Sequence, residues 1–214
     1  MANSIISVEK LVKRFGNNTV LNGVSVEFED HKIHGLIGRN GSGKTVLMKC
    51  ICGLTPITGG SVTVSGKRIG IDCEIIPRAG VIIETPGFLP NLSGYANLKN
   101  LASLTGKIGK DEVRAAISRV GLDPNEKKHV GKYSLGMRQR LGLAQAIMED
   151  PDILILDEPM NGLDKDGVKD MRQYLLDLKA QGKTILIASH SAEDIDVLCD
   201  TVVEMDKGAL SVIR

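Results

Sequence analysis

The sequence of 214 residues is poor in aromatic side chains, in net charge and in long apolar runs. It has no tryptophan, 3% aromatic residues and a formal net charge of +1. No apolar run approaches the roughly 18 residues of a membrane-spanning helix, which excludes an obvious transmembrane segment. A net charge so close to zero provides no overall field that would attract nucleic acid or an anionic membrane. The hydrophobic fraction of 42% is that of an ordinary globular protein.

Cysteine is also scarce, and its spacing excludes the common metal and redox motifs. The four cysteines, Cys50, Cys52, Cys73 and Cys199, form no C-x-x-C pair. Three of them lie in apolar surroundings typical of a core, which suits a reducing compartment. Residues 1–5 lack the basic and apolar regions of a secretory signal peptide. We therefore expect a cytoplasmic protein.

What the sequence does contain is a complete phosphate-loop pattern. Residues 38–45 fit G-x-x-x-x-G-K-[ST] and lie between a strand-like run at 33–37 and a helical stretch at 45–51. In such a loop, backbone N–H groups and the positive end of a helix dipole surround a phosphate. Lys44 is expected to reach the β- and γ-phosphates, and the Thr45 hydroxyl to hold Mg²⁺. The alternative is a glycine-rich turn with a surface lysine. The strand-loop-helix context favours a nucleoside triphosphate bound by Gly38, Arg39, Asn40, Gly41, Ser42, Gly43, Lys44 and Thr45.

Two adjacent carboxylates end another predicted strand. Residues 153–156 are Ile-Leu-Ile-Leu, and Asp157 and Glu158 follow. Ligands of parallel sheets bind beyond the carboxyl ends of the strands, where the phosphate loop also lies. We expect Asp157 to reach Mg²⁺, directly or through water, and Glu158 to polarise the attacking water. The alternative is a strand-end turn with two solvated acids.

Two further segments are candidates for the same site. His190 follows the predicted strand at 184–187, beside the strand that ends in Asp157. A lone histidine is usually a surface or core residue, but this position makes it a candidate site residue. Ser134 is a good N-cap for the helix that follows it, and a helix N-terminus attracts anions. Residues 161–164 (N-G-L-D) would by themselves be a loop with an acidic end.

The order of the predicted elements indicates an α/β fold. Residues 5–30 alternate apolar and polar positions as two antiparallel strands, and short strands are predicted at 61–64 and 79–83. Residues 92–149 contain three predicted helices (93–104, 110–120 and 134–148) and no strand. Strands at 153–156 and 184–187 flank a helix at 166–181. We predict one domain over 1–214. A mostly parallel P-loop core and an antiparallel β subdomain (about 1–91 and 150–214) are interrupted by an all-helical insertion (about 92–149).

Taken in order, these pieces resemble the nucleotide-binding subunit of an ABC transporter over about residues 5–210. They are the phosphate loop, helical insertion, serine-capped helix, D-E strand end, N-G-L-D turn and S-H strand end. The resemblance implies ATP and Mg²⁺ as cofactors and ATP hydrolysis as the activity. It also implies a head-to-tail dimer, expected to be a homodimer, and a separate transmembrane permease subunit that holds the chain at the inner face of the cell membrane.

The resemblance assigns roles to particular residues. Phe15 looks like the aromatic residue that stacks on adenine, and His190 like the switch histidine that contacts the γ-phosphate. Residues 161–164, ending in Asp164, look like the loop that crosses the dimer interface. Residues 133–137 occupy the place of the L-S-G-G-Q signature, so that Ser134, Gly136 and Met137 are expected to cap the γ-phosphate bound by the other subunit.

Two departures from the family pattern point to a subgroup. The signature reads Y-S-L-G-M, with Leu135 in place of a glycine and Met137 in place of a glutamine. Glu84, in I-I-E-T-P, stands where the family has a Mg²⁺-ligating glutamine, and a carboxylate oxygen can also bind Mg²⁺. Both features resemble the subgroup that exports lantibiotics, bacitracin and related peptide antibiotics. We expect this chain to drive export of such a compound.

Two other classes of P-loop protein are alternatives to an ABC transporter subunit, and the role of residues 88–92 is open. A soluble ABC ATPase acting on ribosomes or nucleic acid usually carries two such domains, a coiled coil or basic extensions. None of these features is visible in this sequence, so we expect no nucleic-acid partner. A P-loop kinase would need a lid for an acceptor substrate. The apolar residues 88–92 are either a docking surface for a membrane subunit or a loop packed on its own core.

Overall fold

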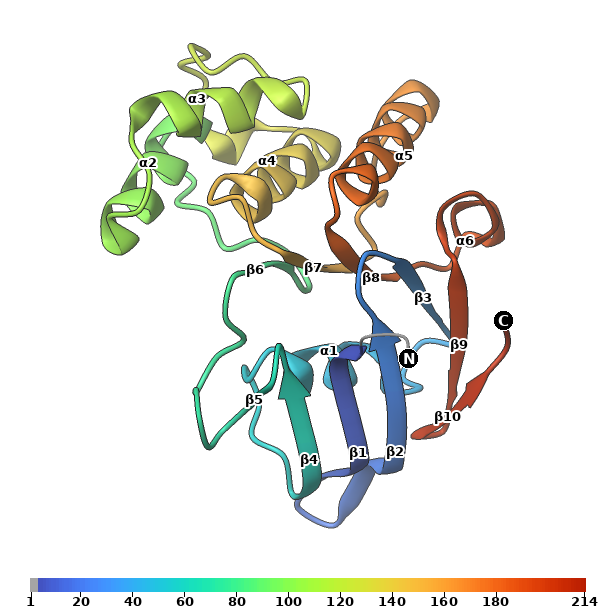
Figure 1. Ribbon diagram of the computed structural model, residues 1–214. Helices are drawn as coiled ribbons and strands as arrows, with labels where there is room; N and C mark the ends of the chain where they lie inside the picture. The colour runs from blue at the N-terminus through green and yellow to red at the C-terminus, as the bar shows by residue number, and fades with distance from the viewer. Residues whose placement is uncertain (1–3) are drawn as a thin grey trace.

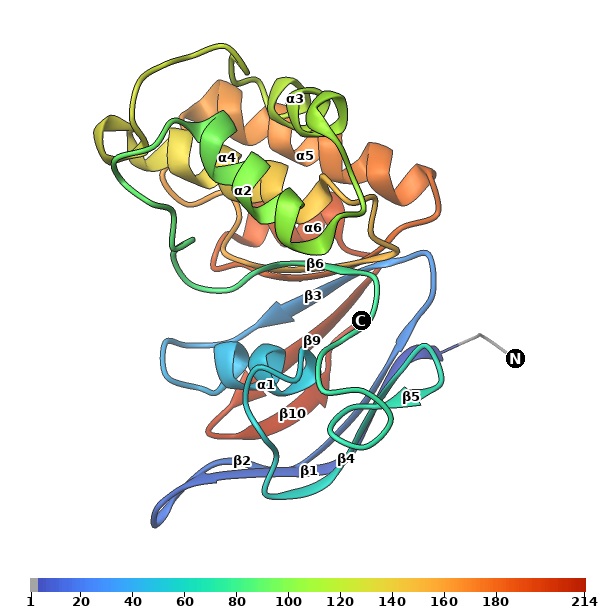
Figure 2. The same ribbon diagram turned by 90° about the vertical axis from the view of Figure 1, so that its left-hand side faces the viewer.

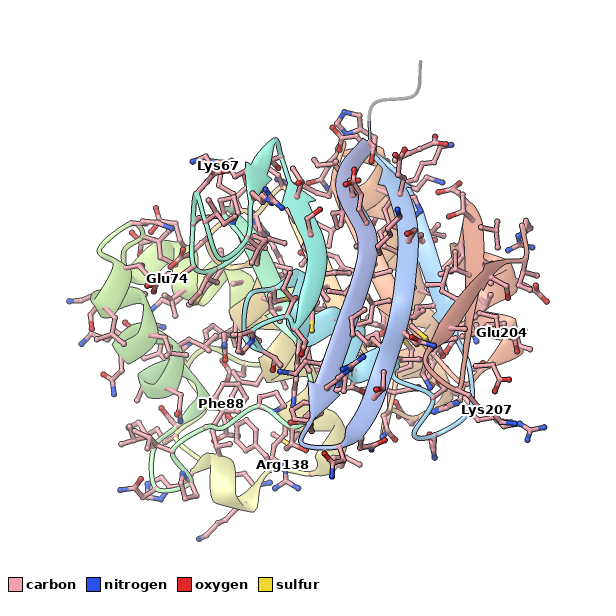
Figure 3. The ribbon with its side chains drawn as sticks, turned by 90° about the horizontal axis from the view of Figure 1, so that it is seen from below. Lys67, Glu74, Phe88, Arg138, Glu204 and Lys207 are labelled. Atoms are coloured by element: carbon pink, nitrogen blue, oxygen red, sulfur yellow. The ribbon has the colours of Figure 1, made fainter. Side chains whose placement is uncertain are left out.

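The strands of the computed structural model, which describes residues 4–214, form two sheets (Figure 1). The first is antiparallel, in the order β2-β1-β4-β5. Its strands are β1 (Ser4–Phe15), β2 (Asn18–Glu29), β4 (Gly59–Val64) and β5 (Lys67–Arg68). Figure 3 looks onto this sheet, where β4, β1 and β2 lie side by side.

The second sheet is almost entirely parallel, in the order β10-β9-β3-β8-β7-β6. Only the pairing of β10 with β9 is antiparallel. Its strands are β3 (Ile33–Ile37), β6 (Ala79–Ile82), β7 (Ile153–Asp157), β8 (Thr184–Ala188), β9 (Thr201–Asp206) and β10 (Ala209–Val212). Since β3, β6, β7 and β8 run the same way, the residues that follow them lie along one edge.

Apolar cores lie on both faces of the parallel sheet. Helix α1 (Lys44–Ile51) lies between the two sheets in Figure 2, and Ile153 and Ile155 of β7 pack in the core on that side. Leu154 and Leu156 point to the other face, where helices cover the sheet. This alternation explains why β7 and β8 are continuous apolar runs, as strands covered on both faces require.

The second face is covered mainly by the helical insertion and by helix α5 (Lys165–Ala180) (Figure 1). The insertion contains α2 (Gly94–Thr105), α3 (Lys110–Arg119), a short 3₁₀ helix η1 (Val130–Lys132) and α4 (Leu135–Ile147). Ser93 and Ser134 cap α2 and α4 with their hydroxyls, and Asp164 caps α5 with its carboxylate. These are the side chains that satisfy free N–H groups at helix starts.

The predicted fold class is confirmed. The helices α2, α3, α4 and α5 lie within one residue of the bounds predicted from the sequence. The predicted elements do not include β5, β9, β10 or the short helix α6 (Ala192–Leu198). The assignment of 1–214 to one domain with an insertion at 92–149 stays a prediction, and its first three residues lie outside the described part. Over residues 4–214, no helix combines the length and the apolar character needed to cross a membrane.

Candidate functional site

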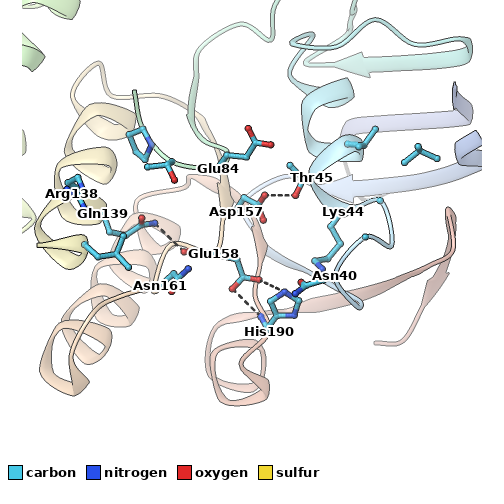
Figure 4. Close-up of a pocket in the computed structure, with 17 residues that line it drawn as sticks. Asn40, Lys44, Thr45, Glu84, Arg138, Gln139, Asp157, Glu158, Asn161 and His190 are labelled. Atoms are coloured by element: carbon cyan, nitrogen blue, oxygen red, sulfur yellow. Dashed lines mark hydrogen bonds and ion pairs between the residues drawn. The ribbon is translucent and has the colours of Figure 1, made fainter. Parts of the chain in front are cut away.

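A cavity of about 440 Å³ lies at the carboxyl edge of the parallel sheet, between the phosphate loop and the helical insertion (Figure 4). It brings together residues that the sequence places in six separate segments. The residues that line it are Val20, Asn40, Gly41, Gly43, Lys44, Thr45, Val46, Glu84, Thr85, Pro86, Leu135, Arg138, Gln139, Asp157, Glu158, Asn161 and His190.

The phosphate loop follows β3 and packs tightly between β2 and β9. A Cβ on Gly38 (φ 143°) would lie 2.3 Å from the Met205 carbonyl oxygen. A Cβ on Gly43 (φ 114°) would lie 3.0 Å from the Leu21 side chain. Both positions need glycine for conformation and for space. The loop is therefore held close to its neighbouring strands, and α1 begins at Lys44, within the last two residues of the loop.

The donors and the charge of the loop suit an anion. The Lys44 ammonium donates to the carbonyl oxygens of Gly38 (2.7 Å) and Arg39 (3.2 Å), and this lysine is only 7% exposed. The buried Ser42 hydroxyl has no hydrogen-bond partner among residues 4–214. An unpaired buried hydroxyl is costly, and the N-terminus of α1 favours negative charge. A phosphate group fits these residues because it would accept hydrogen bonds from them.

Oxygen ligands for a divalent cation lie beside the loop. The Thr45 hydroxyl donates to Asp157 Oδ2 at 2.7 Å, which joins the start of α1 to the end of β7 (Figure 4). In the described part of the chain, no cluster of three or more His, Cys, Asp or Glu side chains could hold a metal ion. A hydroxyl and a carboxylate fit Mg²⁺, which commonly takes its other ligands from phosphate and water.

Glu158 turns away from this pair and faces His190. Its backbone has a φ of 51°, in the left-handed region, and its N–H donates to the Ala188 carbonyl oxygen at 2.9 Å. Glu158 Oε1 lies 3.2 Å from His190 Nε2, which makes an ion pair when the imidazole is protonated (Figure 4). Burial raises the pKa of the Glu158 carboxyl, and the nearby His190 opposes that rise. A carboxylate with a raised pKa is a better general base.

A buried polar network fixes the turn that carries His190. Ser189 donates its hydroxyl to Asp194 Oδ2 at 3.0 Å and accepts from the Ser191 N–H at 3.1 Å. Asp194 is nearly fully buried and is paired with Arg172 of α5, whose Nε donates to Asp194 Oδ1 at 2.8 Å. Because the residues on both sides of His190 are fixed, the histidine has a defined position facing Glu158.

The signature segment forms the opposite wall of the cavity. Ser134 Oγ accepts from the Met137 N–H at 3.1 Å, and Leu135 and Gln139 line the cavity. A Cβ on Gly162 would lie 2.5 Å from the Leu135 side chain, so this leucine packs directly on the turn at 161–164. Gly136 also packs against this turn, since its Cβ would lie 2.8 Å from the Gly162 carbonyl oxygen.

Glu84 lines the cavity but does not join Thr45 and Asp157. Its carboxylate pairs with the Lys49 ammonium at 2.7 Å and is 64% exposed (side chain). Lys49 lies on α1, one turn after Thr45, so the pair lies along the helix that follows the phosphate loop. Glu84 also has a left-handed φ of 62°. Its predicted role as a metal ligand stays a prediction.

Phe15 lies at the end of β1 and is 51% exposed. It is not among the residues that line the cavity. Its hairpin nevertheless contacts the phosphate loop, because Val20 lines the cavity and a Cβ on Gly43 would meet the Val20 carbonyl oxygen at 3.3 Å. The contact with the phosphate loop is thus made by β2 of this hairpin, and the predicted stacking role of Phe15 stays a prediction.

The loop at 88–92 has features both of an exposed docking surface and of a loop packed on its own core. Phe88 packs against the core of the helical insertion, whereas Leu89 is 53% exposed. The buried Asn97 fixes the backbone of Leu89: its Oδ1 accepts from the Leu89 N–H (2.8 Å), and its amide donates to the Leu89 carbonyl oxygen (3.1 Å).

Several residues of the site have no sequence motif that could have found them. Lys49, Gln139, Arg172 and Asp194 are polar residues within helices, where they look like surface positions. Gln139 nevertheless donates its amide to the Glu158 carbonyl oxygen at 3.2 Å. Their partners are 19 to 35 residues away in the chain. Only the fold brings them together.

Comparisons with known proteins all match this chain to ABC transporter proteins. The family profile described as "ABC transporter" matches residues 21–161. The uncharacterized ABC transporter ATP-binding protein YybJ of Bacillus subtilis is 44% identical over 206 residues, which cover 96% of this chain and 94% of that protein. The bacitracin transport ATP-binding protein BcrA of Enterococcus faecalis is 43% identical over 96% of this chain and 68% of its own.

Two further matches agree with these. The lantibiotic transport ATP-binding protein SrtF of Streptococcus pyogenes is 36% identical over 92% of this chain and 85% of its own. A solved structure described as an ATP-binding subunit of an ABC transporter superposes with a TM-score of 0.86 at 25% identity. The superposition covers 98% of this chain and 90% of the solved one.

Proposed function

The chain belongs to the ABC transporter family, as an ATP-binding subunit with ATPase activity, and on this premise we propose how its own residues bind and hydrolyse ATP. The observation that carries the proposal is the single cavity in which the phosphate loop, the Thr45–Asp157 pair and the Glu158–His190 pair converge. These groups can bind phosphates, hold a cation and activate a water molecule at one place.

The phosphate loop binds the β- and γ-phosphates of ATP. The Lys44 ammonium leaves the carbonyl oxygens of Gly38 and Arg39 and contacts the phosphates, while the unpaired Ser42 hydroxyl donates to one of them. Residues 39–43 provide backbone N–H groups around the same phosphates. Thr45 and Asp157 would hold Mg²⁺, which when bound would neutralise charge on the phosphate oxygens.

Glu158 acts as the general base and His190 orients it. The carboxylate accepts a proton from the water that attacks the γ-phosphate, and its raised pKa favours this transfer. His190 lies 3.2 Å from the carboxylate and is held by the Ser189–Asp194–Arg172 network. From this place it contacts the γ-phosphate when the nucleotide is bound.

The remaining predicted residues complete the nucleotide site in a dimer. Phe15 stacks on adenine, which suits an exposed ring on a hairpin that touches the phosphate loop. Two copies bind head to tail, so that Ser134, Gly136 and Met137 of each copy cap the γ-phosphate bound by the other. Asp164 and its turn cross the interface. Closure follows because the γ-phosphate provides contacts that hydrolysis removes.

The relatives also support a proposal about the partner and the transported compound. We propose a separate permease subunit that holds the chain at the inner face of the cell membrane, with residues 88–92 at the contact, where Leu89 is exposed. The relatives named for bacitracin and lantibiotic transport support export of a peptide antibiotic or a similar compound. Glu84 and the Y-S-L-G-M segment, as departures from the family pattern, support the same subgroup.

Copurification tests the proposal. A tagged Glu158→Gln chain is expressed in its native cells and isolated with ATP from detergent-solubilised membranes. We expect a polytopic membrane protein to copurify, with an untagged strain as the control. Recovery only outside the membrane fraction, with ribosomes or nucleic acid attached, would support the alternative class of soluble ABC ATPases.

The role of Glu84 is tested by its replacement with glutamine. Glu84→Gln is expected to retain ATP hydrolysis but to need a higher Mg²⁺ concentration for half-maximal rate, because an anionic ligand is lost. Lys49→Gln is the matched control, since it removes the ion pair and keeps the carboxylate. If Glu84→Gln leaves the metal dependence unchanged, Glu84 is not a ligand.

A further inference from the structure

The side chain of Lys13 is buried, although Lys13 is not part of the phosphate site. Lys13 lies on β1, two residues before Phe15, and is only 8% exposed. Its Nζ donates to the Pro56 carbonyl oxygen at 2.7 Å. Within the described part of the chain, no carboxylate forms an ion pair with it. Burying a charge without an anionic partner costs free energy, so another interaction has to compensate.

That interaction is with the Phe15 ring. The Lys13 ammonium lies 4.5 Å from the centroid of the ring, inside the range of about 6 Å for a cation–π contact. Phe15 is exposed by half even though one face of its ring is covered by the ammonium. An exposed phenyl ring at the end of a strand is thereby held in one orientation.

The same lysine connects the ring to the segment that follows α1. Pro56 lies in the segment between α1 and β4. Two more hydrogen bonds join β1 to this segment: Thr58 N–H donates to the Val12 carbonyl oxygen (2.8 Å), and Arg14 N–H donates to Thr58 Oγ1 (3.0 Å). A ring fixed relative to α1 has a fixed distance to the phosphates, as a site that binds base and phosphates together requires.

We propose that Lys13 is a positioning residue that holds the Phe15 ring for stacking on the purine base of the bound nucleotide. The inference rests on the proposed role of Phe15. The ammonium draws electron density toward one face of the ring, and the electron-rich purine stacks on the other. The hydrogen bond to Pro56 keeps the ammonium, and with it the ring, in register with α1.

Two ligands, one with and one without the nucleoside, test this proposal. Calorimetric titration of the full chain with ATP and with inorganic tripolyphosphate, both with Mg²⁺, compares binding with and without adenosine. Lys13→Met removes the charge, and Lys13→Gln removes it while keeping a donor for Pro56. Both are expected to weaken ATP binding about three- to tenfold and to change tripolyphosphate binding by less than about twofold. Lys67→Met, at an exposed lysine of β5, is the control.

The outcomes separate this proposal from the role of Phe15. Phe15→Ala should weaken ATP binding selectively, and Lys13→Met should add no further loss in that variant. Equal losses for ATP and tripolyphosphate in the Lys13 variants would mean that Lys13 acts through the phosphate site or the fold, and would overturn the proposal. A selective loss in Phe15→Ala with unchanged ATP affinity in both Lys13 variants would overturn it as well. An unchanged ATP affinity in Phe15→Ala would instead show that Phe15 does not stack on the base, and the proposed role of Phe15 itself would be wrong.

Discussion

Replacement of Glu158 by glutamine is expected to lower the rate of ATP hydrolysis by a factor on the order of 10² to 10⁴, while ATP still binds. The amide has nearly the shape of the carboxylate but cannot accept the proton of the attacking water. The phosphate loop and the Thr45–Asp157 pair do not involve the Glu158 side chain, so the affinity for ATP should be kept. Phosphate release under saturating ATP and a titration with ATP measure the two quantities separately.

Glu27→Gln is the matched control for this experiment, because Glu27 is an exposed position on β2, away from the cavity. It should hydrolyse ATP at the rate of the unchanged chain. Near-normal turnover of Glu158→Gln would show that another group is the base. A parallel loss of ATP affinity would mean that the carboxylate contributes to binding rather than to the chemical step.

Replacement of Lys44 by alanine is expected to weaken ATP binding by roughly a hundredfold or more. A charge-assisted hydrogen bond contributes about 1.5–3 kcal/mol, and the lysine is expected to contact more than one phosphate. The alanine also leaves the Gly38 and Arg39 carbonyl oxygens without their donor, so the loop loses internal contacts. Calorimetric titration with ATP and Mg²⁺ measures the effect.

Lys169→Ala provides the comparison, since Lys169 is an exposed lysine of α5. Its ATP affinity should equal that of the unchanged chain. Should Lys44→Ala still form a tight complex with ATP, the loop at residues 38–45 would not be the phosphate site. A far-ultraviolet circular dichroism spectrum shows that the variant retains its helices and strands.

The parts of the site that the sequence could predict are those in which local pattern and chemistry coincide. The phosphate loop needs glycines at positions where the chain approaches its neighbours, as Gly38 does against Met205. Asp157 follows a strand of four branched residues, and such strands are buried in parallel sheets. In these segments a few consecutive residues determine both the conformation and the position in the fold.

The contacts that the sequence could not predict join residues from distant elements. Glu84 pairs with Lys49, and Arg172 with Asp194, only because helices and loops meet in the folded chain. The left-handed backbone of Glu158 is also invisible in the sequence, because glutamate rarely adopts it and no turn motif marks it. The strands β9 and β10 were missed because their pairing depends on β3, which lies far away in the chain, and on the turn at Gly208.

We propose above that two copies of this chain close on two ATP molecules, each bound between the phosphate loop of one copy and Ser134 of the other. Light scattering of the Glu158→Gln chain during gel filtration, with the bound nucleotide counted in the same peak, tests it most directly. The account predicts, with ATP and Mg²⁺, a species of twice the chain mass of 23.0 kDa that holds two ATP molecules.

Ser134→Asp in the Glu158→Gln background is the decisive comparison, because aspartate still caps α4 but places a negative charge at the γ-phosphate. That double variant should bind ATP at its own phosphate loop and remain a monomer. A Glu158→Gln chain that stays monomeric with one ATP, or a dimer that Ser134→Asp leaves intact, would contradict the account.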